Sequence, residues 1–179
     1  MSDFRVHILG CGSATPTARH TPSCQVVDAH GKLFMIDCGE GAQLEFRHQG
    51  LKFSRLGHIF ISHMHGDHFL GLPGLLSTMA LHEKTGDLTV HIHPEGARLL
   101  QQIMAVLCRE TTYTLHYDII TPGERRTLYE DRSLVVETFP LYHRVACSGF
   151  IFREKQQRRP LRADMLEFHQ VPLVQRRAI

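Results

Sequence analysis

The sequence has no apolar run that approaches the roughly 20 residues needed to cross a membrane as a helix. Its first residues lack the basic start and uninterrupted apolar block of a secretory signal peptide. The five cysteines include no C-x-x-C pair and are spread along the chain, which predicts reduced, mostly buried thiols. These absences argue against a membrane protein and against a disulfide scaffold, and we expect a cytoplasmic protein.

The sequence also lacks a phosphate-binding P-loop, because the glycine-rich stretch at residues 10–16 does not fit G-x-x-x-x-G-K-[ST]. Strong net charge is absent as well, at only +2, but the charge is unevenly distributed. Residues 153–179 hold seven Lys or Arg and three acids, whereas residues 1–152 hold 13 basic and 15 acidic side chains. Arg suits bidentate phosphate contacts. The basic segment is therefore either a solvated helix or loop, or an edge that approaches RNA backbone.

Length and composition indicate one globular domain. The chain has 179 residues, of which 42% are hydrophobic and 21% charged, and it can bury a substantial core. Apolar patterns predict strands at residues 4–9, 23–29, 32–37, 58–62, 88–93, 115–120, 126–129, 133–139 and 149–153. Helices are predicted at 42–49, after residue 68 to 81 with a break near Pro73, at 94–108 and at 163–169. This mixture predicts α/β layering around a single core.

Four metal-capable side chains stand within six residues, at His63, His65, Asp67 and His68. His63 and His65 are two positions apart, so on an extended segment they point to the same side. Asp67 and His68 fall on the turn that opens the next helix. The strand end can thus offer two imidazoles to one metal, and the turn can offer a carboxylate and an imidazole to a second. Zn²⁺ favours this mixture of nitrogen and oxygen ligands.

Such a pair of metals, roughly 3.5–4 Å apart, can clamp a phosphodiester during in-line displacement. The alternative is a histidine-rich surface loop, since the chain has 14 His. The spacing, the carboxylate and the strand-to-helix setting favour the metal site.

Other candidate ligands follow strands elsewhere in the chain. His143 comes just after the strand predicted at 133–139 and could complete a three-His set, or it could be an ordinary loop histidine. His91 and His93 share a strand face, but no carboxylate is near them in the sequence, so we do not expect them to be ligands. Asp37 closes a strand, where it could orient a metal-bound imidazole or cap the following helix. Cys38 and Cys147 are disfavoured as ligands.

Together these residues resemble the metallo-β-lactamase superfamily, whose hallmark is H-x-H-x-D-H after a strand. More narrowly, residues 9–17, 22–26, 36–41, 59–68 and 71–76 resemble ribonuclease Z, the tRNA 3′-processing endonuclease. Residues 141–145 and 148–150 resemble the next ligand-bearing segment of that family. The match covers most of residues 4–152.

The resemblance implies an αβ/βα sandwich with the metals at the strand ends. It implies His63, His65 and His143 on one zinc, Asp67 and His68 on the other, and Asp67 also as the general base. A complete active site would hold two Zn²⁺. Residues 1–152 would form the N-terminal half to two-thirds of the fold. Residues 153–179 would lead toward a substrate-binding arm.

In function, the resemblance implies a zinc-dependent endoribonuclease that removes the 3′ trailer from precursor tRNA, as a homodimer when complete. The family pattern continues beyond residue 179 with the arm, a metal-bridging Asp and two further His. We therefore expect a truncated, weakly active or inactive form that leaves apolar sheet surface exposed. The alternatives are another phosphodiesterase or hydrolase of the superfamily, which residues 71–76 disfavour, and a non-catalytic binding module, which the complete 63–68 motif disfavours.

Overall fold

The computed structural model describes residues 4–156 and 163–172. In these residues a mixed sheet has six strands that lie side by side in chain order. They are β1 (Arg5–Gly10), β2 (Cys24–Ala29), β3 (Lys32–Ile36), β4 (Leu56–Phe60), β5 (Asp87–Ile92) and β6 (Thr114–Ile119). The pairs among β1, β2 and β3 are antiparallel, and those from β3 to β6 are parallel. The carboxyl ends of the parallel strands therefore meet at one edge of the sheet.

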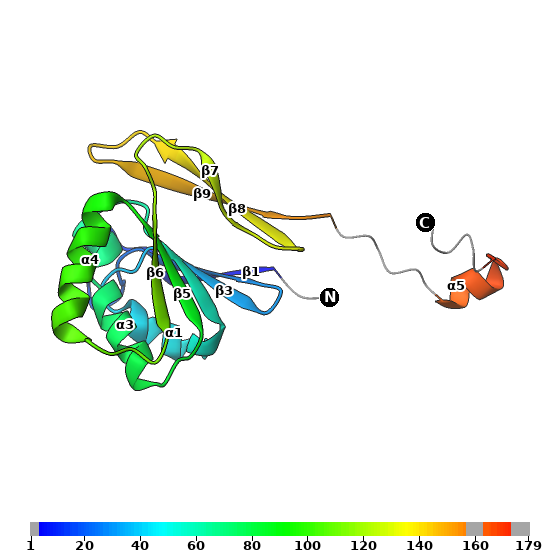
Figure 1. Ribbon diagram of the computed structural model, residues 1–179, viewed down its shortest axis with the longest axis horizontal. Coiled ribbons are helices and arrows are strands. Elements are labelled where there is room, and N and C mark those ends of the chain that lie inside the picture. Colours follow the sequence, from blue (N-terminus) through cyan, green and yellow to red (C-terminus); the bar gives the residue numbers. More distant parts are fainter. Residues whose placement is uncertain (1–3, 157–162, 173–179) are drawn as a thin grey trace.

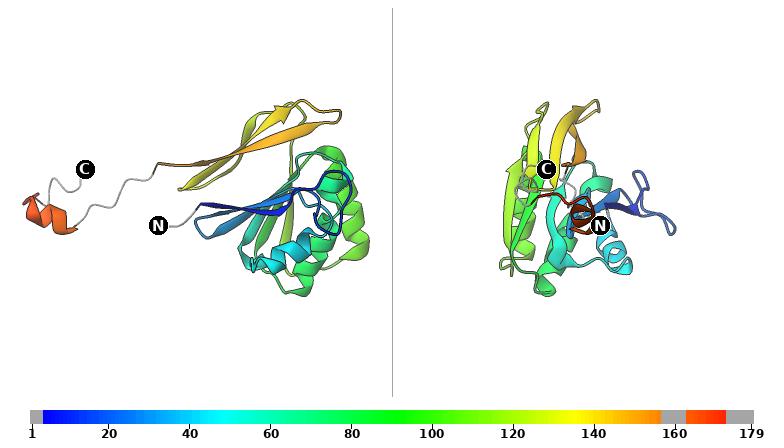
Figure 2. Two further views of the ribbon diagram at one scale, coloured as in Figure 1. Left: turned by 180° about the vertical axis from the view of Figure 1, so that it is seen from behind. Right: turned by 90° about the vertical axis from the view of Figure 1, so that its right-hand side faces the viewer.

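Helices cover one face of this sheet and a second sheet covers the other (Figure 1). The helices are α1 (Ala42–His48), α2 (Gly66–Phe69), α3 (Leu72–Leu81) and α4 (Pro94–Leu107), with a 3-10 turn, η1, at Phe53–Arg55. The second sheet is antiparallel, with β7 (Arg126–Glu130), β8 (Leu134–Leu141) and β9 (Cys147–Glu154). Figure 2 shows the same layers from behind and from the side. No helix in the described part is both long and apolar enough to span a membrane.

Alternation along the central strands builds two separate cores. Val26 and Ile59 belong to the cluster on the helix side, whereas their neighbours Val27 and Phe60 belong to the cluster shared with the second sheet. Successive side chains on a strand point to opposite faces, so a strand that is buried on both faces must be apolar at nearly every position. This requirement explains the short, continuous apolar runs of the sequence.

Except at α2 and α3, the strand and helix predictions agree with these elements to within about two residues at their ends, as expected for boundary assignments. The second and third strands, β2 and β3, form a hairpin in which Ala29 pairs with Lys32. His30 and Gly31 both have positive φ, at 50° and 82°, as a two-residue turn of type I′ requires.

The prediction of a helix break at Pro73 was wrong in its position. The chain leaves α2 at Phe69 and starts α3 at Leu72, so Pro73 lies in the first turn of α3. A proline in the first turn removes no helical hydrogen bond, because that N–H would have no partner within the helix.

The sequence also predicts exposed apolar surface on the sheet and a helix in the basic segment. Val6 pairs with Val27 and so lies on the side of the second sheet, yet Val6 and Ile8 are 55% and 54% exposed. Apolar surface is thus open to solvent along β1. The predicted helix at 163–169 is confirmed as α5 (Ala163–Phe168), which lies apart from the two layers (Figure 1). The rest of the basic segment, at 157–162 and 173–179, lies outside the described residues.

Candidate metal centre

The candidate site lies where the parallel strands end. Asp37 follows β3 directly, and residues 61–65 continue from β4 toward α2. The extended path continues past β4, since the N–H of Ile61 donates to the carbonyl of His91. The site therefore lies at the carboxyl edge of the sheet, where open α/β folds place ligands.

Three imidazoles meet at this edge, those of His63, His65 and His143. One ring nitrogen from each lies within 4.8 Å of the others. Nδ1 of His65 is 3.1 Å from Nε2 of His63 and 3.3 Å from Nε2 of His143. Donors about 2.0–2.1 Å from a tetrahedral metal are about 3.3 Å apart, so this spacing fits one ion held by three nitrogens. The turn that carries His143 reaches this position from the second sheet.

Asp67 and His68 lie beside the triad on α2. Nε2 of His68 is 3.6 Å from Oδ2 of Asp67, and the ring centroids of His63 and His68 are 4.0 Å apart. A carboxylate oxygen and an imidazole nitrogen thus face a common point next to the first donor group. The donor chemistry is that of a second divalent ion.

Asp37 is buried next to the triad and the Asp67–His68 pair, with 4% of its surface exposed. Its Oδ2 accepts a hydrogen bond from Nδ1 of His68 at 2.6 Å and one from Oγ of Ser62 at 3.0 Å. Its Oδ1 accepts from the N–H of Ser62 at 2.8 Å. Helix α1 has Gly41 at its N-cap, without a side-chain cap. Of the two roles left open by the sequence, these contacts favour orienting an imidazole over capping the helix.

These contacts determine which ring nitrogens are free. The Ser62 hydroxyl donates to Asp37, so it accepts from Nδ1–H of His63, 2.9 Å away. Nε2 of His63 then keeps its lone pair and faces His65. The same reasoning gives His68 a proton on Nδ1 and a lone pair on Nε2. One carboxylate thus sets the tautomers of two histidines, directly for His68 and through a hydroxyl for His63.

Titration of the site follows from burial and from the two carboxylates. Burial, and next the neighbouring His68, lower the pKa of His63 to about 4, so this imidazole is neutral at pH 7. Burial alone would lower the pKa of His68, but the hydrogen bond to Asp37 and the negative charges of Asp37 and Asp67 together outweigh it and raise the pKa. Burial would raise the pKa of Asp67, but the N–H of Ala14 and the nearby His68 lower it, which keeps the carboxylate ionised.

Backbone contacts hold α2 against the turn after β3. The N–H of Cys38 donates to the carbonyl of His68 at 2.8 Å, and the N–H of Gly71 donates to the carbonyl of Cys38 at 2.9 Å. Gly71 approaches so closely that a Cβ would collide with the carbonyl oxygen of Gly39. Glycine at position 71 therefore allows the segment after α2 to pack closely against the turn after β3.

A cleft of about 650 Å³ opens over the donors. It is lined by the metal-capable side chains and by Ser13, Ala14, Pro16, Glu40, Leu70 and Arg144. The loop between β1 and β2 forms one wall and donates the N–H of Ala14 to Oδ2 of Asp67 at 2.7 Å. Solvent and a substrate can reach the donors from this side.

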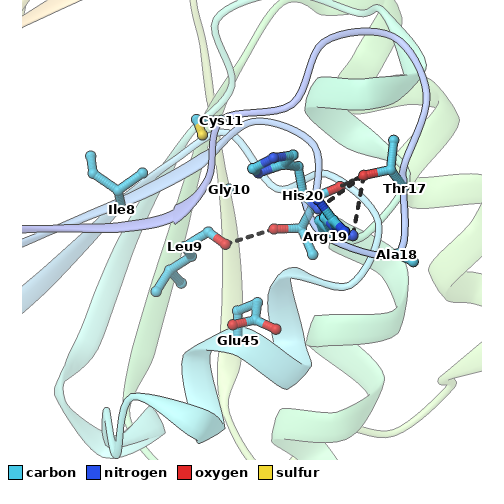
Figure 3. A pocket seen from close by; sticks show the side chains of 10 residues that line it. Ile8, Leu9, Gly10, Cys11, Thr17, Ala18, Arg19, His20 and Glu45 are labelled. Carbon is cyan, nitrogen blue, oxygen red and sulfur yellow. Dashed lines mark hydrogen bonds between the residues drawn. The ribbon is translucent and has the colours of Figure 1, made fainter.

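Other residues of the same loop, at 17–21, line a different cavity of about 270 Å³, shown in Figure 3. There the Thr21 hydroxyl donates to the carbonyl of Leu9 at 2.7 Å, and Oγ1 of Thr17 accepts from the N–H of His20 at 2.9 Å (Figure 3). These contacts give the loop a defined path, and that path brings Ala14 to the carboxylate of Asp67.

The disfavoured ligand candidates lie elsewhere. His91 and His93 are 1% and 0% exposed and do not reach the triad. A carboxylate does accompany His91, contrary to expectation, because Asp118 reaches it from the neighbouring strand at 2.7 Å. Cys38 is fully buried, and burial raises the pKa of its thiol, whereas a metal ligand must be a thiolate.

Sequence reasoning missed two parts of the site, the Ser62 hydroxyl and the Ala14 N–H. The N–H is a backbone group that any residue would supply. The hydroxyl stands next to His63 in the sequence, but only the path of the chain reveals its contact with Asp37.

Comparison with known proteins gives consistent relatives. The family model described as "Anti-Pycsar protein Apyc1" matches residues 4–171. Ribonuclease Z of Phocaeicola vulgatus is 50% identical over 173 residues, which are 97% of this chain and 56% of that protein. Ribonuclease Z of Bacteroides thetaiotaomicron is 49% identical over 174 residues, or 97% and 55% of the two chains. The resemblance to ribonuclease Z is therefore confirmed, and the chain spans about half the length of these relatives.

Solved structures show the same fold. Human tRNase Z, short form, matches with a TM-score of 0.74 and 30% identity over 83% of this chain and 64% of that chain. The metallo-β-lactamase fold protein YhfI of Bacillus subtilis matches with a TM-score of 0.61 and 18% identity over 83% and 57%, which shows the fold alone. The described residues thus have the metallo-β-lactamase fold, as predicted, and this fold together with the imidazole cluster implies a metal centre.

Proposed function

Because the chain belongs to the family described as anti-Pycsar protein Apyc1 and its curated relatives are ribonuclease Z proteins, we propose that it supplies the metal-binding residues of a phosphodiesterase that cleaves precursor tRNA. One observation carries the proposal. Three imidazole nitrogens converge within 4.8 Å, and a carboxylate and a fourth imidazole lie beside them at the mouth of an open cleft.

The proposed ligand sets follow the two donor groups. His63, His65 and His143 hold one Zn²⁺, and Asp67 and His68 contribute to the site of a second. Asp37 holds the imidazole of His68 directly and that of His63 through Ser62. The neutral state of His63 at pH 7 supports this assignment, because a protonated imidazole cannot bind a metal.

The chemistry assigned to these residues is hydrolysis of a phosphodiester. Bound divalent metals lower the pKa of water and stabilise negative charge on phosphoryl oxygens. Asp67 is the general base that accepts a proton from the attacking water, and the N–H of Ala14 fixes the position of its carboxylate. Water attacks the phosphorus, the bond to the 3′ oxygen breaks, and that oxygen takes up a proton from solvent or from a group outside these residues, so the products end in a 3′ hydroxyl and a 5′ phosphate.

Precursor tRNA is the proposed substrate because the relatives are named ribonuclease Z and tRNase Z. The cation Arg144 lines the cleft and can meet a phosphate. Residues 1–152 form the proposed catalytic part, and the basic segment 153–179 leads toward bound RNA. Homodimerisation is proposed as well, with the exposed apolar residues of β1 as one available surface. The cytoplasmic location stays a prediction.

A cleavage assay tests the proposal. Precursor tRNA with a labelled 3′ trailer is incubated with the purified chain and Zn²⁺ or Mn²⁺, in parallel with the variants Asp67→Ala and Asp87→Ala. Asp87 is a matched control, because its exposed carboxylate lies at the start of β5, away from the cleft. Because the chain is proposed to be a truncated form, we expect at most weak release of the trailer by the wild type, equal release by Asp87→Ala, and none with Asp67→Ala or a chelator. Trailer release that Asp67→Ala leaves unchanged would overturn the assignment.

A second candidate is a different phosphodiesterase of the same fold. The description of the matching family favours it, because that description names no tRNA nuclease. Hydrolysis of bis(4-nitrophenyl) phosphate without any cleavage of precursor tRNA would establish this candidate over the first. Binding of tRNA with no hydrolysis of either substrate and no binding of Zn²⁺ would favour a binding module and overturn both.

A further inference from the structure

His93 is a completely buried histidine at the carboxyl end of β5, and both of its ring nitrogens are engaged. Nδ1 lies 3.1 Å from the carbonyl oxygen of Ile120, and Nε2 lies 3.2 Å from Oγ of Ser148. A carbonyl only accepts hydrogen bonds, so the proton is on Nδ1. Nε2 therefore accepts, and the Ser148 hydroxyl donates to it.

Ser148 is 2% exposed and joins the second sheet to the first. Its hydroxyl contacts His93 at the end of β5, while its N–H donates to the carbonyl of Ser62 at 2.9 Å. Ser62 directly precedes His63. One residue of β9 is thus attached both to the end of a central strand and to the backbone beside the triad.

The position of Ser148 in its own sheet relates this attachment to His143. Ser148 pairs with Pro140, and Cys147 pairs with Leu141, so the turn at 142–146 begins directly beyond the attachment. His143 is exposed and lies on that turn. The distance of 3.3 Å between Nε2 of His143 and Nδ1 of His65 therefore depends on where the base of the hairpin is held.

We propose that His93 and Ser148 are positioning residues that hold the β8–β9 hairpin where His143 can complete the metal-binding triad. The inference rests on the proposed metal-binding role of His143 and is independent of which phosphodiester is cleaved. Neither residue touches the metal position. Their hydrogen bond fixes the approach of the third ligand, as the outer partners of metal sites do.

The test measures affinity for Zn²⁺ by competition with a chromophoric chelator, and the visible spectrum of the Co²⁺-loaded protein. Ser148→Ala removes one oxygen and keeps the packing, and His93→Leu removes both ring contacts. Each should weaken the affinity about 10–100-fold. His93→Gln keeps one donor and one acceptor and should restore most of the affinity. It also tests the proposal should the leucine variant fail to fold.

Thr138→Val is the matched control. The Thr138 hydroxyl is buried on β8 but has no hydrogen-bond partner among the described residues, so its loss should leave the affinity unchanged. Thermal unfolding is followed in parallel, because a purely structural role would lower the melting temperature without moving the affinity or the Co²⁺ spectrum.

His143→Ala separates the two possible failures. Weak binding by His143→Ala with wild-type binding by Ser148→Ala and His93→Leu would overturn the positioning role alone. Wild-type binding by His143→Ala would overturn the proposed ligand set, and the positioning role with it.

Discussion

Two histidine pairs with the same H-x-H spacing have opposite surroundings in this protein. His63 and His65 lie in the cleft, and two of their nitrogens face each other and His143. His91 and His93 lie in the interior, and all of their ring nitrogens face protein partners. Nδ1 of His91 meets Asp118 at 2.7 Å, and Nε2 meets His58 at 3.0 Å.

The difference shows that the partners of a histidine, rather than its spacing, determine its role. A lone pair that accepts a hydrogen bond inside the protein is not available to a metal. His91 is also stacked on Phe60, with ring centroids 4.3 Å apart, so it belongs to the core between the sheets. We therefore expect the cleft histidines to bind the metal directly. In the interior pair, His91 should contribute to stability, whereas His93 should affect metal binding only through its contact with Ser148.

The largest expected effect is on the cleft group. His65→Ala removes the nitrogen that faces both other imidazoles, and it should weaken binding of Zn²⁺ by more than about 100-fold, since even outer partners of a metal site contribute 10–100-fold. Competition titration with a chelator measures the change. His48→Ala, at an exposed position on α1, is the control and should bind like the wild type. Equal affinity in the two variants would show that His65 is not a metal ligand.

Substitution of His91 in the interior should lower the stability of the protein. His91→Ala leaves the Asp118 carboxylate without one of its donors and opens space beside Phe60, and it should lower the free energy of unfolding by about 2–4 kcal/mol. Urea unfolding measures this loss, while affinity for Zn²⁺ should stay unchanged. His116→Ala, on the exposed side of β6, should change stability by at most about 0.5 kcal/mol. A metal-binding defect in His91→Ala would contradict the account.

Asp37 sets the tautomers of His63 and His68 in the cleft. Asp37→Asn keeps the shape of the side chain but no longer favours protons on Nδ1 of His68 and His63, and affinity for Zn²⁺ should fall about 10–100-fold. The same titration measures it. Asp28→Asn changes a carboxylate on β2 that pairs with Arg55, and its affinity should match the wild type. A loss of similar size in both variants would point to a general effect of charge.

The smallest expected effect is a pH dependence in the interior. Burial would raise the pKa of Asp118, but the hydrogen bonds from His91 and Arg126 outweigh it and lower the pKa from 3.8 to about 2. The stabilisation is therefore complete above pH 4 and is lost as the pH falls toward 2. The difference in unfolding free energy between wild type and Asp118→Asn should be about 1–2 kcal/mol at pH 6 and should shrink in that window. A difference independent of pH would be inconsistent with this pairing.

The sequence predicts the cleft group well because its members are local. Four of the metal-capable residues lie within six positions, and His143 follows a strand whose end the apolar pattern predicts. The interior group is not predictable in the same way. Asp118 follows His91 by 27 residues and meets it because β5 and β6 pair in parallel with these two residues in register. Without strand order and register, His91 has no visible carboxylate partner.

Local rules also left two questions that only the fold answers. Asp37 could have capped a helix or oriented an imidazole, and its contacts depend on where β4 and α2 lie. The break near Pro73 was expected from the same proline rule that explains its actual place in the first turn of α3. In both cases the residue type was informative, but the partner was set by tertiary packing.

Anomalous diffraction at the zinc edge from crystals grown with Zn²⁺ tests the central claim most directly. We expect a peak about 2.0–2.1 Å from Nε2 of His63, Nδ1 of His65 and Nε2 of His143. A peak between His58 and His91, a peak on a cysteine sulfur, or no peak at the triad would contradict it.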